Sequence, residues 1–494
     1  MLTAPLPTGR HFAVTWSIPD DFGGMTGALL HRSRGFRREA GVAVTVLTLD
    51  DRIDYADVAS RLRDAGELID GVSLLNLYDW LRTHPLPGER GSGARHPFRP
   101  LRPDDPDVVG LEHDGRVLRR ERRGPGGEIL QVDHYRQDGS LVVSDRRDLD
   151  RRGGSAKRSV VVCDQRGQPH RSWSHISGLY AAWIDALVAG SRAWLVIDSK
   201  TAARSLLGYR RRGTVVVHVV HGAHVSSSPG SDVIPSRRKV FSRLDAFDAV
   251  VFLTRRQRDH AARLTAHRGR LVTIPLGITL PPSNPPAESE RAGAVVLARL
   301  SALKRVDHAI AAIERVNAVV TPPLTLDIWG DGSRRAALMR RIDGDPVLTL
   351  HHHDPAARGV LREASVLLVT SRSEGFGLAI LEAMAAGCIP VAYDVPYGPG
   401  EIIRHGRNGM LVADGDVDAL ADAVRSVIAQ PPAARDAQRR AARERAAQFS
   451  DDRVTRLWGR ALRRARRRGM SRRTVEGVTW RARRWARVLT RRRR

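Results

Sequence analysis

The chain has 494 residues, enough for two or three ordinary domains, and its 42% hydrophobic and 27% charged residues are typical of a globular protein. This composition excludes a disordered or fibrous chain. The apolar runs, such as Val215 to Val220, are strand-length and far short of the roughly 18 residues that a membrane span needs. Met1 to Arg10 holds no apolar region typical of a secretory signal, and Cys163 and Cys388 are expected to be buried free thiols in a reducing compartment. We therefore expect a cytoplasmic protein.

The net charge of +27 is unevenly distributed along the chain. Arg453 to Arg494 contains 18 arginines and one acidic residue, Glu476, and so carries +17 of that charge. Such a segment favours an anionic partner: a membrane surface, an anionic polymer or nucleic acid. Trp480 and Trp485 are spaced among the arginines as in a membrane-surface helix, and few aromatic side chains are available to stack on bases. We expect peripheral attachment to the inner face of the cell membrane and no binding of nucleic acid; the alternative is a solvated tail in an arginine-rich chain.

The first elements predict a βαβ unit. Phe12 to Ile18 is a short apolar run typical of a strand, and Pro19 to Gly24 follows as a turn. Met25 to Ala40 has helical spacing, and Val42 to Leu49 predicts a second strand. A right-handed crossover is expected between the two strands.

From about Pro85 to His170 the pattern changes, because helical spacing disappears and turn signals separate short β-like runs. These runs are Arg116 to Arg119, Ile129 to Tyr135, Leu141 to Ser144 and Ser159 to Asp164. They predict an inserted antiparallel sheet. Alternation of helices and strands resumes at Gly178, with a helix expected over Arg238 to Phe247 and a strand over Ala249 to Leu253. A proline-rich linker begins at Pro281.

A second alternating unit follows the linker and predicts a doubly wound α/β domain. Its expected strands and helices are Ala294 to Leu297, Asp307 to Val320, Leu324 to Trp329, Val347 to His351, Val366 to Thr370, Leu378 to Ala386 and Ile389 to Tyr393. The chain is thus divided into an N-terminal Rossmann-like domain (1–84 and 171–280), a β-rich insertion (85–170), a C-terminal Rossmann-like domain (281–430), closing helices (431–468) and an arginine-rich tail (469–494).

The sharpest motif is Ser373-Glu374-Gly375-Phe376-Gly377-Leu378-Ala379-Ile380-Leu381-Glu382, which opens a helix directly after a buried strand. Free backbone N–H groups at a helix start favour a phosphate or a sugar hydroxyl. Glu382 lies eight residues after Glu374, about two helical turns further on. Two carboxylates held in this way could bond hydroxyls at both ends of a sugar nucleotide. A helix with a salt-bridged glutamate is the alternative interpretation.

Two cations, Arg299 and Lys304, lie in the loop between a strand and a helix of the same half. Loops at the carboxyl ends of strands in a doubly wound sheet gather at the ligand crevice. Two cations in that place can neutralise a diphosphate leaving group. A solvated surface loop is the alternative.

The first half offers two weaker signals. Gly23 and Gly24 stand where a strand turns into a helix, so the backbone there can approach a phosphate closely. His221 and His224 follow the strand Val215 to Val220, where a histidine could polarise a hydroxyl or a phosphate, or be satisfied at the strand end. The run His351 to His353 is a weak metal candidate, because neighbouring residues of a strand point to opposite faces.

Together these motifs resemble the retaining GT-B glycosyltransferases of the glycogen-synthase-like superfamily. The segments Gly23-Gly24-Met25-Thr26 with Arg32 or Arg34, Asp248 to Thr254, and Asp394 to Pro399 with Glu401-Ile402-Ile403 resemble more closely the wall teichoic acid α-glycosyltransferases, which also carry an inserted β-sheet. The resemblance implies two Rossmann-like domains facing a cleft, an acceptor domain first and a nucleotide-sugar domain second. It implies a UDP-linked donor, an anionic polyol-phosphate acceptor and association of copies through the insertion.

The resemblance also implies roles for single residues. Arg299 and Lys304 would bind the donor diphosphate, and Glu382 would hold the ribose hydroxyls. Glu374 would bond the hydroxyls of the transferred sugar, and His224 would lie beside the reacting sugar. The expected catalytic residues are therefore Lys304, Glu374, His224 and Arg299. The remaining expected contacts are with the donor at Gly24, Phe376, Gly377 and Leu378, and with the acceptor at Gly23 and His221.

The chain departs from the family pattern at Arg305 and Gly400. These departures weaken the resemblance on the acceptor side of the site more than on the donor side. No second carboxylate stands out as a nucleophile in the first half, so we expect front-face departure and attack without a covalent intermediate. With two cations at the diphosphate, no metal and no other cofactor is expected. The alternative acceptors are a glycolipid, a small polyol or a glucan. Two alternatives are not enzymes: a nucleic-acid-binding protein, and a protein of the GT-B fold that has lost catalysis and only binds.

Overall fold

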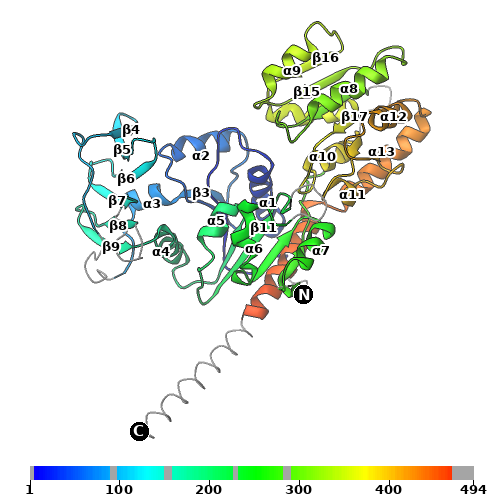
Figure 1. Ribbon diagram of the computed structural model, residues 1–494. Helices are drawn as coiled ribbons and strands as arrows, with labels where there is room; N and C mark the ends of the chain where they lie inside the picture. Colours follow the sequence, from blue (N-terminus) through cyan, green and yellow to red (C-terminus); the bar gives the residue numbers. More distant parts are fainter. Residues whose placement is uncertain are drawn as a thin grey trace.

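A computed structural model of the chain describes residues 5–88, 97–148, 158–225, 232–266, 268–281 and 291–469. Three sheets organise these residues (Figure 1): a seven-stranded and a six-stranded parallel sheet, and a six-stranded antiparallel sheet. The parallel sheets each form a doubly wound α/β domain, and the antiparallel sheet is inserted into the first of them. This confirms the predicted fold class. The arginine-rich tail after Gly469 lies outside the described residues.

The first domain is built on the seven-stranded sheet, whose central strands are rich in β-branched and apolar residues and are buried on both faces. The strands follow one another across the sheet in the order β13 (Leu271–Thr273), β12 (Ala249–Phe252), β11 (Thr214–Val220), β10 (Ala193–Ile197), β1 (Arg10–Thr15), β2 (Val44–Thr48) and β3 (Val72–Asn76). The order reverses at β1, and the crevice outside the carboxyl ends at such a point is where ligands bind in this class of sheet.

Helices cover both faces of this sheet. One face packs against α1 (Gly24–Ala40) and α2 (Tyr55–Asp64), and the other packs against α4 (Ile176–Val188), α5 (Lys200–Ser205) and α6 (Pro235–Phe241). Further helices of this domain are α3 (Leu77–Thr83) and α7 (Arg255–Arg263).

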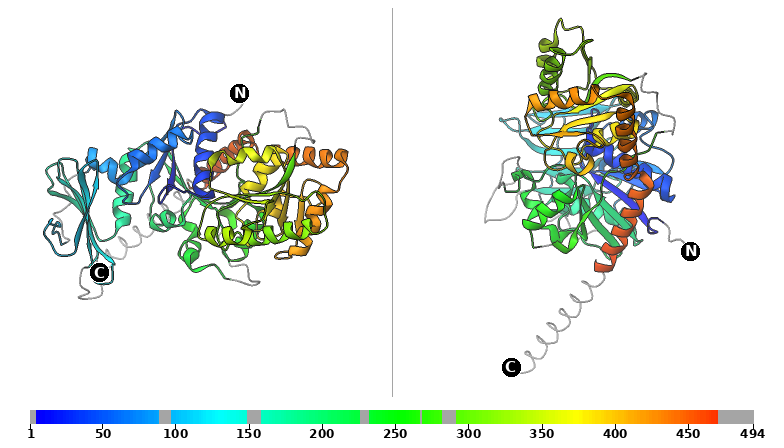
Figure 2. Two further views of the ribbon diagram at one scale, coloured as in Figure 1. Left: turned by 90° about the horizontal axis from the view of Figure 1, so that it is seen from above. Right: turned by 90° about the vertical axis from the view of Figure 1, so that its right-hand side faces the viewer.

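The inserted sheet is a meander in which each strand pairs with the next along the chain. Its strands are β4 (Val108–His113), β5 (Arg116–Arg123), β6 (Ile129–Tyr135), β7 (Leu141–Arg146), β8 (Ser159–Cys163) and β9 (Pro169–Trp173). One face of it packs on the first domain, where the ring of His134 stacks on Tyr78 at 3.9 Å between centroids. Figures 1 and 2 place the insertion at the end of the first domain that is remote from the second domain.

The second domain has its own six-stranded sheet and its own core. The strand order is β16 (Leu348–His351), β15 (Leu326–Trp329), β14 (Ala292–Leu297), β17 (Ala364–Val369), β18 (Ile389–Tyr393) and β19 (Met410–Val412). The helices are α8 (Val306–Asn317), α9 (Arg335–Ile342), α10 (Leu378–Ala386), α11 (Pro399–Ile402), α12 (Val417–Ile428) and α13 (Pro432–Ala447).

The chain crosses between the two domains twice, and the two crossings lie side by side. The backbone N–H of Ile278 donates to Phe449 O at 3.0 Å, and the N–H of Asp451 donates to Ile278 O at 3.2 Å. Residues 451–469 then form a helix that packs back on the first domain, where Trp458 contacts Phe36 edge-on at 5.9 Å between centroids. The last described helix is therefore part of the core of the first domain.

Some predicted elements differ from those observed. The helix expected over Arg238 to Phe247 begins earlier, at Pro235 in the first helical position, and ends at Phe241. A separate 3-10 turn, Leu244–Ala246, carries the chain into the core instead. Both cysteines are free and buried, as expected. Within the described ranges, no helix is both long and apolar enough to cross a bilayer.

Candidate active site

The glycine loop of the first domain is held in place by charged side chains. Asp20 pairs with Arg52 at 2.8 Å and also with Arg61. The next residue, Asp21, accepts a 2.8 Å hydrogen bond at its carbonyl oxygen from Arg299, which belongs to the second domain. Gly23 caps α1, and no side chain of the described residues accepts a hydrogen bond from the first turn of that helix. The N–H groups at the start of α1 are therefore free to meet a ligand, with Arg299 next to them.

Lys304 and Glu374 meet in the second domain, where the loops after β14 and β17 lie together. The Lys304 ammonium donates to Glu374 Oε1 at 2.5 Å. The loops are braced from both sides: Thr370 donates its hydroxyl proton to the carbonyl oxygen of Lys304 at 2.8 Å, and Glu374 exchanges backbone hydrogen bonds with the 396–397 segment at 3.0 and 2.7 Å. The expected donor residues thus form one pair with a fixed geometry.

The loop that carries Glu374 touches the first domain directly at Gly375. A Cβ atom at this position would lie 1.6 Å from the carbonyl oxygen of His221, so only glycine fits. Phe376 is buried and packs edge-on against Phe449, at 5.7 Å between centroids. Gly377 then adopts a left-handed conformation with φ of 97° and caps α10 without a side-chain hydrogen bond. The start of α10 at Leu378 is therefore a second uncapped helix N-terminus at the domain junction.

His221 belongs to a buried ionic cluster at the carboxyl ends of β10 and β11. Its Nε2 lies 2.7 Å from Asp198, which also accepts two hydrogen bonds from Arg32 on α1, both at 2.7 Å. Burial alone would raise the pKa of Asp198, but the charge and hydrogen bonds of Arg32, together with His221, hold it at about 2. Asp198 therefore stays ionised and fixes the His221 ring at the crevice.

His224 lies at the domain interface, inside an aromatic cluster. Its ring is fully buried and stacks on Phe241 at 5.1 Å and on Tyr397 of the second domain at 5.4 Å. Neither ring nitrogen has a hydrogen-bond partner among the described residues. Burial, helped by the nearby charges of His260 and Arg237, lowers the pKa of His224 to about 3. The ring is therefore neutral at physiological pH, and its expected place beside the reacting sugar stays a prediction.

Glu382 lies on α10 and forms an ion pair with Arg358 at 3.0 Å. Burial raises the pKa of its carboxyl, and the charges of Arg358 and His31 partly offset that effect. Arg305, the neighbour of Lys304, is buried and plays a different part: it pairs with Asp414 and donates to the carbonyl oxygen of Thr370 at 2.9 Å. Arg305 therefore supports the loop below the pair Lys304–Glu374.

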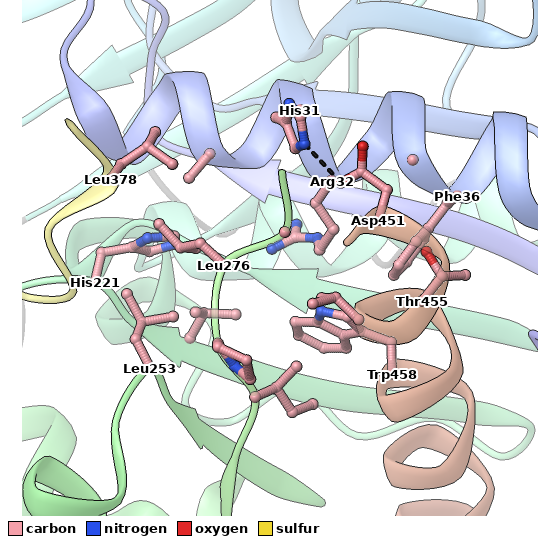
Figure 3. A pocket seen from close by; sticks show the side chains of 17 residues that line it. His31, Arg32, Phe36, His221, Leu253, Leu276, Leu378, Asp451, Thr455 and Trp458 are labelled. Carbon is pink, nitrogen blue, oxygen red and sulfur yellow. Dashed lines mark hydrogen bonds and ion pairs between the residues drawn. The ribbon is translucent and has the colours of Figure 1, made fainter. Parts of the chain in front are cut away.

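A pocket of about 500 Å³, a volume that includes some open solvent, lies where α1, the end of β11, residues 274–277 and the last helix meet (Figure 3). His221 and Leu378 lie at one side of it, and at the other side the guanidinium of Arg32 lies over the ring of Trp458, 5.1 Å from its centroid. His31 bonds Asp451 across its rim at 2.7 Å. The pocket joins the ionic cluster of the first domain to the start of α10 in the second.

Sequence reasoning did not single out Asp198, Asp21 or Glu401 as partners of the site residues. Glu401 accepts a 2.6 Å hydrogen bond from the backbone N–H of Arg256 and so links the second domain to the start of α7. Asp198 could have been found from its position directly after a buried strand, because polar residues at the carboxyl ends of such strands reach the crevice.

The histidine run 351–353, the weak metal candidate of the sequence, makes hydrogen bonds to nearby aspartates instead. His351 bonds Asp327 at 2.7 Å and stacks on Trp329 at 4.0 Å, and His352 bonds Asp331 at 3.0 Å. Among the residues that the structure describes, no group of three or more His, Cys, Asp or Glu side chains could hold a metal ion.

Comparisons with known proteins agree on the family. Residues 283–445 match the family model of the group 1 glycosyl transferases. The chain is 22% identical over 479 residues to the poly(glycerol-phosphate) alpha-glucosyltransferase of Bacillus subtilis, covering 86% of this chain and 70% of that protein. It is 19% identical over 470 residues to the poly(ribitol-phosphate) alpha-N-acetylglucosaminyltransferase of Staphylococcus aureus, covering 84% and 92% of the two proteins.

Solved structures show the same architecture. A mutant of Staphylococcus aureus TarM, crystallised with Fondaparinux, alpha-GlcNAc-glycerol and UDP, superposes with a TM-score of 0.75 at 17% identity over 92% of this chain and 100% of that one. Pneumococcal GtfA, crystallised with UDP and GlcNAc, superposes with a TM-score of 0.67 at 19% identity over 92% and 99%. The chain is therefore a glycosyltransferase with the GT-B fold, and its second domain belongs to the group 1 glycosyltransferases.

Proposed function

We propose that the chain is a retaining α-glycosyltransferase that moves a sugar from a UDP-linked donor to a polyol-phosphate polymer of the wall teichoic acid type. The pair Lys304–Glu374, which the neighbouring Gly375 brings next to His221 of the first domain, carries this proposal, because it provides a cation for a diphosphate and a carboxylate for sugar hydroxyls at one point of the crevice. The polymer-modifying relatives named above supply the acceptor class.

Residues at the crevice can stabilise the leaving group and hold both the transferred sugar and the ribose. Arg299 and Lys304 neutralise the charge that develops on the departing diphosphate, assisted by the uncapped starts of α1 and α10. Glu374 orients the transferred sugar, and Glu382 holds the ribose. The acceptor hydroxyl attacks the anomeric carbon from the side that the diphosphate leaves, and a leaving phosphate oxygen takes its proton. The configuration at the anomeric carbon is therefore retained.

The proposal extends to the place of the enzyme in the cell. The segment Arg453 to Arg494, with +17 of the net charge, attaches the chain to the inner face of the cell membrane, where a lipid-linked acceptor is displayed. Copies of the chain associate through the inserted sheet. The residues after Gly469 lie outside those that the structure describes.

A donor screen tests the proposed function. Purified enzyme is incubated with a panel of UDP-, GDP- and ADP-sugars, with and without a glycerol-phosphate or ribitol-phosphate polymer, and both free nucleotide and glycosylated polymer are measured. We expect release of UDP that the polymer stimulates, with an α-linked product. Transfer to a glycolipid, a glucan or a peptide, with none to either polymer, would contradict the acceptor class.

A further inference from the structure

Arg237 lies beside the site but has no part in the functions described so far. It is on α6, partly buried, and its Nε donates to the carbonyl oxygen of Ala223 at 3.2 Å. Its Nη2 lies against Gly222, where a Cβ atom would be 3.3 Å away. Gly222 in turn packs against Gly375, the residue after Glu374. A single glycine therefore separates this guanidinium from the loop expected to hold the transferred sugar.

Four other cations around the crevice each have a carboxylate next to them. Arg32 pairs with Asp198 at 2.7 Å, and Lys304 pairs with Glu374 at 2.5 Å. Arg299 lies 3.6 Å from the carboxylate of Asp21, and Arg358 lies 3.0 Å from Glu382. Each of these cations thus has a carboxylate of the protein within 4 Å.

Arg237 differs from them in this respect. Burial lowers the pKa of its guanidinium to about 10, and no carboxylate of the described residues offsets that effect. The stretch 226–231, which follows the histidine loop, contains no acidic residue in its sequence. Removing a cation from water without a partner is unfavourable, so a bound anion would stabilise this arrangement.

The geometry of the guanidinium suits a phosphate. Nε is fixed by Ala223, which leaves the terminal nitrogens with hydrogens that no described residue accepts. The planar fork of arginine binds phosphate oxygens with two parallel hydrogen bonds, which an ammonium cannot do. The diphosphate of the donor has its own cations, Arg299 and Lys304, in the second domain, whereas Arg237 belongs to the first domain.

We propose that Arg237 binds a phosphate of the acceptor chain, next to the hydroxyl that receives the sugar. This inference rests on the proposed function and sharpens it. The contact selects an acceptor in which a phosphodiester adjoins the receiving hydroxyl, and it sets the register of the polymer in the crevice. Arg237 is an acceptor-binding residue in this role, separate from the donor residues.

The test compares Arg237→Gln and Arg237→Lys with Arg238→Ala, an exposed arginine of the same helix whose Nε donates to Val233 O at 3.2 Å. Initial rates are measured with a synthetic glycerol-phosphate oligomer and with glycerol as acceptors, at saturating UDP-sugar. We expect Arg237→Gln to raise the KM for the oligomer at least tenfold, the scale of hydrogen bonds to a charged group, with the KM for glycerol and for the donor within twofold. Arg237→Lys falls between, and Arg238→Ala matches the wild type.

Two results would overturn the proposal: an unchanged KM for the oligomer, or equal losses of activity with the oligomer and with glycerol, which would indicate a structural role.

If the wild type transfers nothing to the oligomer, the proposed acceptor class fails. The melting temperature in inorganic phosphate, with UDP present, then decides the role of Arg237. Phosphate should then stabilise the wild type and Arg238→Ala but not Arg237→Gln. Equal stabilisation of all three would overturn the anion site itself. If Arg237→Gln does not fold, Arg237→Lys takes its place, and its KM values for the oligomer and for glycerol are compared with those of the wild type in the same way.

Discussion

The ammonium of Lys304 lies 2.5 Å from the carboxylate of Glu374, although the two residues are 70 positions apart in the sequence. The contact joins the loop after β14 to the loop after β17, two strands that are neighbours in the sheet of the second domain. Because both loops leave the sheet at its carboxyl edge, the pairing follows directly from the strand order.

We expect Lys304→Ala and Glu374→Gln each to lower turnover of a UDP-sugar by about a hundredfold or more, the scale of one preorganised contact to a developing charge. Lys239→Ala, the loss of an exposed lysine on α6, is the matched control and should leave turnover within twofold. Melting temperatures establish that the variants are folded. Near-normal turnover in both site variants would refute the donor-site assignment.

Turnover is expected to need no added divalent metal, because Arg299 and Lys304 provide the positive charge that a metal provides elsewhere. The measurement is the initial rate of UDP release after exhaustive treatment with EDTA, compared with Mg²⁺ and Mn²⁺ additions. A rate that EDTA abolishes and either metal restores would show this expectation to be wrong.

Stability should depend on pH through Asp50, which follows β2 and accepts a 2.5 Å hydrogen bond from the Tyr55 hydroxyl. Burial raises the pKa of Asp50 from 3.8 to about 7, a shift that the hydrogen bond from Tyr55 only partly opposes. Between about pH 4 and pH 7 the folded chain keeps a proton that the unfolded chain releases, so the contribution of Asp50 to the free energy of unfolding falls as the pH rises.

Asp50→Asn removes this titration while keeping an oxygen that can accept from Tyr55. We expect the urea midpoint of the variant, relative to the wild type, to be higher near pH 8 than near pH 5. Asp138→Asn, a change at an exposed turn, is the control and should show a much smaller pH dependence. The same difference between variant and wild type at both pH values would contradict the shifted pKa.

The basic tail should bind anionic membranes. We expect the full chain to sediment with anionic liposomes, less so at high salt, since each basic residue near an anionic surface contributes up to about 1 kcal/mol. A chain ending at residue 468 keeps nearly all of the helix 451–469 and should bind less while transferring sugar to a soluble acceptor at the normal rate. Full sedimentation of the shortened chain, or preference of the full chain for neutral liposomes, would count against membrane attachment.

The sequence was sufficient for the architecture and for bringing Lys304 and Glu374 together, whereas their role in donor binding stays a prediction. Alternating strands and helices predict two doubly wound domains, and loops at strand ends predict that Arg299, Lys304 and Glu374 lie near one crevice. The cluster around Asp198 could not be predicted in this way, because its contact with Arg32 depends on β10 pairing with β1, which are far apart in the chain. The burial of His224 likewise depends on Tyr397, a residue of the other domain.

The packing of Trp458 against Phe36 has a consequence for synthesis of the chain. Trp458, Leu462 and Ala465 belong to the same buried cluster as Phe36 and Leu29, so the last described helix completes the first domain. The second domain is continuous in sequence and carries its own core. A chain emerging from the ribosome can therefore finish the second domain while part of the first still lacks its covering helix. The buried cluster of the first domain can therefore be completed only after the whole second domain has been translated.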